Sequence, residues 1–493
     1  MSRKIHLSLI AALSLTSLNA MEFKTVGFKA TGMGGAGVAS TRGSMAGYYN
    51  PALLRFSDHT SEFSINAGVK VQESNLVENM DNLSDIDFDG ALERIGDNAT
   101  TDNSKTNSTE DNQNIQTAQD IISSIGSNNG LNISATPSLS AQISDAFAIG
   151  VYATADIAMN FNISDDKDQF IFENDGKYFR YDPTANNGTG QYTETSKSNY
   201  ESHSIELNNV EVNAVALSEI PISYAKAYDF NSGTWSFGIN LKPMGLVTYS
   251  DTVSLGESSQ HAEDNSDDTT NETTYKANIG IDVGVAYRPK DSKVTLGLIG
   301  KNINNPTFKV DQASENQDIV SEDQTIDAMY RAGISLPIWN DNVEFAFDVD
   351  LTKNDTLVAG EQSQMMGGGI ELHPASWFSL RVGAMQDMAS EKFDDGTIMT
   401  AGLGFGLKWA QIDISAMMGT NTGTYEGEEV PTYAALNVSL VSKWGDGYNK
   451  KTPPSKSETT QKPIKRNNTL SPQRKEEMIN RANQAHSELD NNI

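Results

Sequence analysis

Several segments of the chain alternate strictly between apolar residues and polar or small residues. From Tyr275 to Tyr287 the odd-numbered residues are apolar or aromatic, and the even-numbered ones are charged, polar or small. The same alternation runs from Val343 to Leu351 and from Trp235 to Lys242. A period of two places the two sets on opposite faces of a β-strand. The alternation is compatible with a soluble sandwich, whose apolar faces turn inward. It is equally compatible with a membrane barrel, whose apolar faces meet lipid.

The spacing of these segments favours the membrane barrel. About fourteen strands are predicted from residue 61 to residue 444, and the links after every second strand are only a few residues, as at Asn231-Ser232. The early links between them are far longer, and this asymmetry is typical of transmembrane barrels. All five tryptophans fall near the short-turn side, as an interfacial girdle would: Trp235, Trp339, Trp377, Trp409 and Trp444. We therefore predict an all-β fold, a transmembrane antiparallel β-barrel over residues 58–444.

The first twenty residues have the pattern of an export signal. Arg3 and Lys4 precede the apolar run from Ile5 to Leu18, and Ala20 supplies a small residue for cleavage. The run is shorter than the ~20 residues that a membrane-spanning helix needs. The chain contains no cysteine and has a net charge of −29, which excludes disulfides and thiolate metal sites and argues against nucleic acid as a partner.

Residues 21–57 are crowded with glycine, alanine and serine, which allow backbones to approach closely. This composition predicts an N-terminal plug inside the barrel. The candidate plug or gating residues are Gly32, Gly34, Gly35, Gly37, Asn50, Pro51 and Ala52. The spacing of Gly32, Gly34 and Gly37 also matches a dinucleotide-binding fingerprint. That fingerprint requires a following helix and an acidic residue about 20 positions on, which Leu53-Leu54-Arg55 does not provide.

The run Gly32-Met33-Gly34-Gly35-Ala36-Gly37-Val38-Ala39, followed by Asn50-Pro51-Ala52, resembles the FadL-type outer-membrane channels. It resembles more closely the TraF-like family associated with conjugal transfer. The resemblance implies a fourteen-stranded barrel in the outer membrane of a Gram-negative bacterium, with the plug inside it. It also implies a passive channel for hydrophobic small molecules, opened when the plug shifts about Asn50-Pro51. The alternatives are that the glycines only pack, or that the protein is a structural or partner-binding component for conjugal transfer or cell-surface assembly.

The long loops are acidic and are expected to face lipopolysaccharide outside the cell, with both chain termini in the periplasm. Residues 72–132 are rich in Asp, Asn, Ser and Thr, and residues 100–116 are predicted to be disordered. One stretch imitates the start of a calcium loop through Asp85, Asp87, Asp89 and Glu93. Gly96 occupies the twelfth position, where calcium loops carry a bidentate acid. The segment is therefore either a calcium site or an ordinary solvated acidic loop.

The fourth strand is predicted at residues 218–229, and Pro221 within it removes a hydrogen-bond donor. We predict a bulge at Pro221 that opens the barrel wall. Residues 200–217 are compatible with an extra loop strand, a lid or an extension of this strand.

The tail, residues 445–493, is predicted to be a flexible periplasmic linker followed by a short helix that starts at Ser471-Pro472. The helix is either simply solvated or a docking arm for peptidoglycan or a periplasmic partner. The sequence lacks the His-Glu-x-x-His and Gly-x-Ser-x-Gly motifs, so no enzymatic activity and no cofactor are predicted.

Overall fold

The computed structural model describes residues 21–74, 78–79, 82–83, 85–100, 107–125, 129–164, 167–254, 275–313, 319–339, 341–358, 361–406, 410–425, 428–445 and 472–490. The predicted export signal and the predicted linker after Gly445 lie outside these ranges. Within them, no helix is both long enough and apolar enough to cross a membrane.

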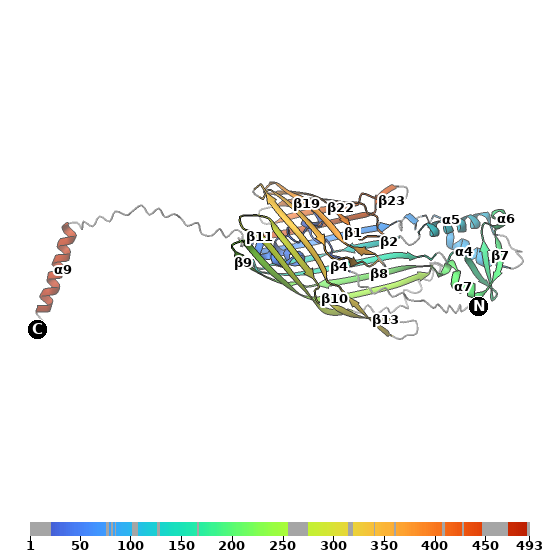
Figure 1. Ribbon diagram of the computed structural model, residues 1–493, viewed down its shortest axis with the longest axis horizontal. Helices are drawn as coiled ribbons and strands as arrows, with labels where there is room; N and C mark the ends of the chain where they lie inside the picture. The colour runs from blue at the N-terminus through green and yellow to red at the C-terminus, as the bar shows by residue number, and fades with distance from the viewer. Residues whose placement is uncertain are drawn as a thin grey trace. The chain divides into compact units, whose positions relative to one another are not determined.

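The main sheet closes on itself as an antiparallel barrel (Figure 1). Its strands are β1 (Ser61–Ser74), β2 (Gly130–Ala135), β3 (Ser138–Gln142), β4 (Phe147–Asn162), β8 (Asn209–Glu219), β9 (Ile222–Phe230), β10 (Gly233–Ser254), β11 (Lys276–Pro289), β12 (Thr295–Lys301), β15 (Met329–Ile338), β16 (Val343–Asp350), β19 (Met365–Ala375), β20 (Phe378–Asp387), β21 (Ile398–Gly406), β22 (Gln411–Met418) and β25 (Tyr433–Trp444). β2 and β3 share the same two neighbours, and so do β8 and β9. Each of these pairs is one wall strand in two segments, so the wall has the fourteen strands predicted.

The two faces of the wall confirm the membrane barrel. On β10 the outward side chains are Trp235, Phe237, Ile239 and Leu241, which are 36 to 49% exposed. The side chains between them that point into the lumen include Ser236, Asn240 and Lys242, which are at most 1% exposed. The same exposed apolar set continues around the wall, for example at Ile65, Phe347 and Val438. An apolar exterior around a polar interior is stable only in lipid.

The two rims of the barrel differ as predicted. Short turns join β3 to β4, β9 to β10, β11 to β12, β15 to β16 and β19 to β20 at one end, here called the turn rim. Trp235, Trp339, Trp377 and Trp444 lie at or near the turn rim, all at least 36% exposed, while Trp409 lies outside the described residues. Ser61 pairs with Trp444, so the barrel begins and ends at the same rim. The long connections emerge at the opposite end, here called the loop rim.

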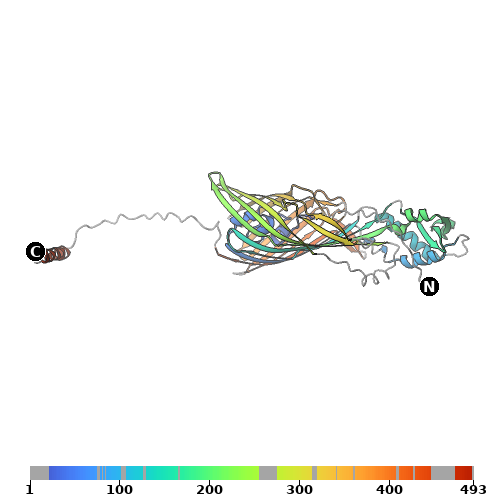
Figure 2. The same cartoon turned by 90° about the horizontal axis from the view of Figure 1, so that it is seen from below.

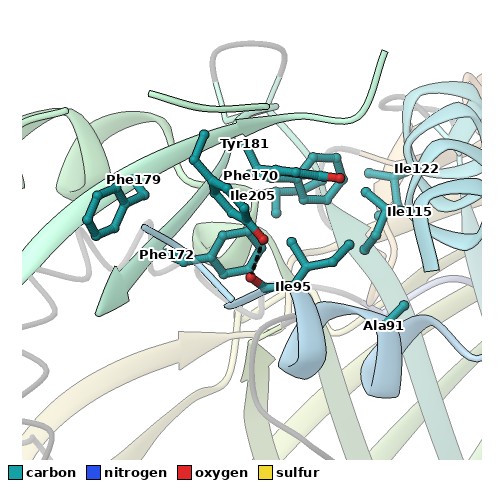
Figure 3. Packing of buried hydrophobic residues seen from close by; sticks show 11 residues of the cluster. Ala91, Ile95, Ile115, Ile122, Phe170, Phe172, Phe179, Tyr181 and Ile205 are labelled. Carbon is teal, nitrogen blue, oxygen red and sulfur yellow. Dashed lines mark hydrogen bonds between the residues drawn. The ribbon is translucent and has the colours of Figure 1, made fainter. Parts of the chain in front are cut away.

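Two of the long connections fold together into a compact unit, here called the outer module. Its elements are α4 (Phe88–Asp97), α5 (Thr109–Ile125), β5 (Phe170–Asn174), β6 (Lys177–Asp182), α6 (Ala185–Gly188), β7 (Gln191–Thr195), α7 (Lys197–His203) and η3 (Ile205–Leu207). Side chains from both connections meet in one core (Figure 3), which comprises Ala91, Ile95, Ala99, Ile115, Ile122, Phe170, Phe172, Phe179, Tyr181, Tyr192 and Ile205. The prediction of disorder over residues 100–116 is therefore wrong from Thr109 onward, where α5 begins, and residues 101–106 are not described.

Three smaller pairs of strands lie in the other long connections. They are β13 (Thr307–Ala313) with β14 (Ile319–Thr325), β17 (Asn354–Asp355) with β18 (Gln362–Ser363), and β23 (Thr422–Tyr425) with β24 (Glu428–Pro431). Figure 2 shows the barrel from below, with its strands tilted against the long axis. The tail forms a separate unit whose described part is the helix α9 (Pro472–Asp490), with Met478 and Ile479 exposed.

The outward face provides a direct test of the membrane assignment. Ile239 is 48% exposed in the middle of the apolar row on β10. We expect Ile239→Arg to destabilise the folded barrel by about 2–4 kcal/mol, because a cation there faces hydrocarbon. Urea titration in lipid vesicles measures this loss. Lys290→Arg at the exposed turn rim is the control and should leave stability unchanged.

Candidate functional site: the plugged lumen

The N-terminal segment lies inside the barrel, where it forms α1 (Phe28–Gly32), η1 (Gly43–Met45), α2 (Ala46–Tyr49) and η2 (Pro51–Phe56). Almost all of residues 30–57 are buried. The segment runs the length of the lumen. Arg55 pairs with Asp145 at the turn rim, at 3.0 Å. Met21 packs against an apolar cluster that includes Leu357, Val358 and Phe393 from the loop-rim connections. The first residue after the predicted signal therefore lies at the loop rim, and only the end of the plug that joins β1 lies at the turn rim.

Glycines of the wall mark the path of the plug. A Cβ added at Gly369 would lie 2.6 Å from the Met33 Cα, and one at Gly383 would lie 2.7 Å from the Gly34 nitrogen. On the opposite wall, a Cβ at Gly238 would lie 2.2 Å from the Ala52 nitrogen. Real Cβ atoms do not approach other atoms so closely. These wall positions therefore require glycine because the plug backbone lies directly against them.

The predicted plug glycines have distinct environments. Gly34 and Gly35 adopt φ angles of 63° and 79°, which other residues rarely adopt. The Gly34 N–H donates to the Thr400 hydroxyl at 3.0 Å. A Cβ at Gly37 would lie 2.3 Å from the Tyr49 ring. Gly32 packs against Arg381. All four glycines are in contact with neighbouring atoms in this structure. Whether these residues also move stays a prediction.

Asn50 forms hydrogen bonds both to the barrel wall and to other residues of the plug. Its Nδ2 donates to the carbonyl oxygens of Val38 and Val285, each at 3.1 Å. Its Oδ1 accepts the Ala52 N–H at 3.1 Å and caps η2, in which Pro51 is the first residue. Asn50 is fully buried. The three predicted residues Asn50, Pro51 and Ala52 thus form one anchor, which lies against β10 and β11.

Ion pairs hold the plug along its length. Lys29 pairs with Glu344 at 2.6 Å and with Glu371 at 2.9 Å. Asp348 of β16 accepts the backbone N–H groups of Gly37 and Val38 at 2.7 and 2.8 Å. Buried charges are tolerated only when they are paired and hydrogen-bonded. The lumen side of the wall is therefore built to receive this segment.

Further ion pairs join nearby wall strands on the lumen side. Arg381 of β20 is 1% exposed and pairs with Glu371 of β19 and with Asp413 of β22, both at 2.7 Å. Lys242 pairs with Glu219 at 2.6 Å and Asp282 at 2.9 Å. The sequence analysis did not identify these residues as a set. The sequence pattern that indicates them is a charged residue that recurs at the lumen-facing positions of alternating strands.

An aromatic cluster lies near the loop-rim end of the plug. The rings of Phe23, Tyr48 and Tyr49 contact one another with centroids 5.1 to 6.1 Å apart. The Lys301 Nζ lies 3.7 Å from the centroid of the Tyr48 ring, and the Arg331 Cζ lies 4.0 Å from that of Phe23. Cations over aromatic faces are attracted to them. Phe23 is thereby held between the plug and the wall.

Between the start of the plug, residues 22–31, and the barrel wall lies a cavity, here called the chamber. Its larger part encloses about 680 Å³ of space not filled by atoms, some of it open to solvent, and an adjoining part about 400 Å³. The apolar lining includes Phe23, Met365, Met385, Ile398, Met417 and Tyr433. The charged lining of the two parts is Glu22, Lys24, Lys70, Asp156, Glu361, Asp387 and Asp395. Phe23 of the plug thus lines the chamber, while Phe28 lies outside it, with its ring centroid 4.6 Å from the Arg381 Cζ.

Glu22 and two lysines form a neutralised group on the chamber wall. Glu22 bonds to both Lys24 and Lys70, and Lys24 also pairs with Asp156 at 3.0 Å. Burial by itself would raise the pKa of Glu22, but the two lysines hold it well below its usual range. Glu22 is therefore ionised at any physiological pH, and both lysines have a counter-ion.

The wall at Pro221 differs from the prediction. The fourth wall strand starts at Asn209, so residues 209–217 extend it. Its pairing with β4 and with β10 keeps the same register on both sides of Pro221, so the predicted bulge is absent. Ile220 donates to Pro243 O at 2.9 Å, and Gly150 donates to Pro221 O at 3.1 Å. The wall is therefore closed at Pro221 in this structure.

Pro221 nevertheless belongs to a weakened part of the wall. The N–H of Ala153 donates to Pro137 O at 3.0 Å, just as Gly150 donates to Pro221 O. Because proline has no N–H, neither Ala153 nor Gly150 receives a ladder bond in return from its proline. The middle of β4 thus lacks one ladder bond toward each neighbour.

The structure also places the candidate calcium ligands. Asp89 and Glu93 lie in α4, so the segment is helical where a calcium loop would wrap around its ion. The Arg94 Nη2 donates to the Asp87 carboxylate at 2.6 Å. No group of three or more potential metal ligands gathers among the residues the structure describes. The helical geometry differs from that of a calcium loop, and whether the segment binds an ion stays a prediction.

These features define a class: an outer-membrane β-barrel of a Gram-negative bacterium whose lumen is filled by its own N-terminal segment. The chain belongs to the family described as "F plasmid transfer operon, TraF, protein", which matches residues 47–351, more than half of its 493 residues. The match includes Asn50-Pro51-Ala52 and confirms the predicted family. A search of curated proteins found no match.

Among solved structures, the chain is similar to the toluene transporter TodX of Pseudomonas putida, with 12% identity, a TM-score of 0.41, and 86% of this chain and 100% of that chain covered. It is similar to the toluene transporter TbuX of Ralstonia pickettii, with 11% identity, a TM-score of 0.41, and coverage of 86% and 100%. A FadL homologue of Pseudomonas aeruginosa has 10% identity, a TM-score of 0.41, and coverage of 85% and 98%.

Proposed function

We propose that this protein is a passive channel for hydrophobic small molecules. A solute enters from the loop rim and binds in the chamber. It passes when residues 22–25, which line the chamber, change position. The observation that carries the proposal is the chamber itself, a cavity whose lining combines apolar side chains with a few polar groups, as small-molecule sites usually do. Its lining includes methionines, aromatic rings and the first residues of the plug.

Two routes lead out of the lumen: through the turn rim, or sideways between wall strands into the membrane. The plug anchor at Asn50 blocks the turn rim, where residues 51–56 are packed against β9, β10 and β11. The weakened ladder on both sides of β4 favours a lateral exit into the membrane instead. We therefore place the exit beside Gly150 and Ala153, and not through the plug anchor.

Uptake measurements test the proposal. Cells that express the full chain should take up a labelled long-chain fatty acid or labelled naphthalene several-fold faster than cells with an empty vector. Deletion of Gly32–Gly37 should change that rate, because the deletion shortens the plug. Equal uptake with the full chain, the deletion and the empty vector would contradict the proposal, provided that both proteins are folded in the outer membrane.

The orientation belongs to the same proposal: the loop rim faces outward, and the turn rim and the tail face the periplasm. The chain has no native cysteine, so single cysteines report position cleanly. We expect Glu110→Cys in the outer module to react with a membrane-impermeant maleimide on intact cells. Lys290→Cys at the turn rim should react at least ~10-fold less until the cells are opened. The reverse pattern would overturn the orientation, and the cysteine-free chain is the control.

The outer module supports a second candidate function, the binding of a macromolecular partner at the cell surface. A packed core in two acidic loops is more than a solute channel needs. Replacement of residues 78–125 and 167–208 by short linkers would remove it. Loss of mating or adhesion with unchanged solute uptake would favour this function, and removal of residues 451–493 tests the tail as a periplasmic docking arm in the same way.

A further inference from the structure

The chamber has an excess of uncompensated acid. Both lysines that line it are already paired, Lys70 with Glu22 and Lys24 with Glu22 and Asp156. Asp387 and Asp395 line the same cavity from the β20–β21 connection and its edge. A solute in the chamber therefore meets carboxylates whose charge the lysines do not cancel.

One oxygen of Asp395 has no hydrogen-bond donor among the described residues. Asp395 is 6% exposed, and its Oδ2 accepts a hydrogen bond from Gln72 Nε2 at 2.6 Å. Its Oδ1 is buried and has no hydrogen-bond partner within the described part of the chain. Thr432 lies beside it, but that hydroxyl already bonds to the backbone oxygens of Asp394 and Asn421. A buried acceptor without a donor is costly to the fold, and a ligand that donates to it recovers that cost.

The backbone keeps Asp395 in place. Its carbonyl oxygen accepts the N–H groups of Thr420 and Asn421 at 3.1 and 3.4 Å. The side chain is thus positioned before any ligand arrives, which reduces the entropy lost on binding.

The surface beside Asp395 is apolar and adaptable. Met385, Ile398, Met417 and Tyr433 form a buried cluster, and Met365 packs against it. Methionine side chains are flexible and polarisable, so they fit apolar groups of varied shape. The Asp395 carboxylate thus lies beside an adaptable apolar surface.

We propose that the chamber selects small amphipathic cations, such as hydrophobic primary amines. The ammonium group donates to Asp395 Oδ1, and the apolar body packs against Met385, Met417 and Tyr433. An alkyl carboxylate of the same length would place its charge next to Asp395 and Asp387, with no unpaired lysine to receive it. The inference rests on the proposed channel function only for the route by which the solute arrives.

Three six-carbon probes test this selectivity: hexylamine, hexan-1-ol and hexanoate. Calorimetry on the detergent-solubilised full chain at pH 7.5 measures their binding. We expect hexylamine to bind at least roughly 10-fold more tightly than hexanoate, since a buried charge-assisted hydrogen bond is worth about that ratio. Hexan-1-ol, which donates without a charge, should fall between them.

Asp395→Asn removes the charge and keeps the shape of the side chain. It should lower hexylamine affinity by roughly 10-fold and leave hexan-1-ol binding within about 2-fold. Asp291→Asn is the matched control, since Asp291 is exposed at the turn rim and its φ of 59° suits asparagine. Heat-modified mobility on a gel shows whether each variant is folded, and Asp395→Glu is a second variant should Asp395→Asn fail to fold.

The pH dependence is an independent readout. Burial, with a smaller contribution from nearby Asp387, raises the pKa of Asp395 to about 6 against the opposing effects of Gln72, Lys70 and Thr432. As the pH falls from 7.5 to 5, Asp395 becomes protonated and the ammonium loses its partner. Hexylamine binding should weaken roughly 10-fold over this range in the native chain and not in Asp395→Asn.

The results separate this proposal from the channel itself. Equal binding of the three probes, tighter binding of hexanoate, or unchanged amine binding in folded Asp395→Asn would each overturn the selectivity. Hexylamine binding that depends on Asp395, together with no uptake of any probe by cells, would uphold the site and contradict the channel.

Discussion

Replacement of Gly238 by valine is expected to unseat the plug without unfolding the barrel. The first side-chain atom would lie 2.2 Å from the Ala52 nitrogen and 2.4 Å from the Pro51 carbonyl carbon. Both belong to the anchor, which is backbone and does not yield as a flexible side chain would. Valine also favours the strand itself. Overpacking of this kind costs about 1–3 kcal/mol, which raises the unplugged fraction roughly 5- to 150-fold.

Single-channel conductance in planar bilayers measures the result, together with the sensitivity of cells to large antibiotics. Gly406→Ala is the control, because the nearest atoms to its new Cβ lie 3.6 Å away. Native conductance in a folded Gly238→Val protein would show that the wall glycines do not hold the plug in place.

Replacement of Arg381 by methionine should be the most destabilising single change in the lumen. It leaves Asp413 without its cationic partner and Glu371 with only Lys29 and the nearby His373. Removal of one member of a buried ion pair typically costs about 3–5 kcal/mol. Phe28 also loses the guanidinium that lies 4.6 Å from its ring centroid. The midpoint of urea unfolding in lipid vesicles should fall accordingly.

The double variant Arg381→Met with Asp413→Asn distinguishes charge from packing. Glu371 keeps Lys29 at 2.9 Å, and the remaining unpaired carboxylate is gone. We expect this variant to recover more than half of the lost stability. If it is no more stable than Arg381→Met alone, the defect comes from the lost side-chain volume and not from the uncompensated charge.

The wall of the barrel is predictable from sequence because each strand carries its own signal. The alternation at residues 235–242 and 275–287 indicates which side chains face outward, and this inference needs no information about the neighbouring strands. The first half of the fourth strand was left open because Val210, Val212 and Val215 follow Ile205 and Leu207 at mixed spacing. Pairing with β4 and β10 makes this segment a strand, and no local sequence pattern indicates that pairing.

The outer module was missed for a related reason. Its core joins Ile95 and Ile115 from one connection to Phe170 and Phe172 from another. Neither connection has enough apolar residues to form a core by itself, and an acidic, asparagine-rich composition suggests disorder. Folding becomes favourable only when the two connections combine.

Of the lumen, the plug was predictable from the sequence, but the wall residues that contact it were not. The glycine-rich composition indicated a segment packed at close range, and the plug is such a segment. Its partners Gly369 and Gly383 gave no signal, because a glycine in a strand usually indicates weakness. The Arg381 network depends on the register of three strands, and a shift of one residue would turn these charges to the lipid.

The position of Met21 has a consequence for the fate of a displaced plug. This residue packs against an apolar cluster near the loop rim, at the end of the lumen farthest from the start of β1. The chain therefore crosses the whole lumen before the first wall strand begins at Ser61. A plug that moves out of its seat stays tethered to β1 at the turn rim and cannot leave the barrel as a separate body.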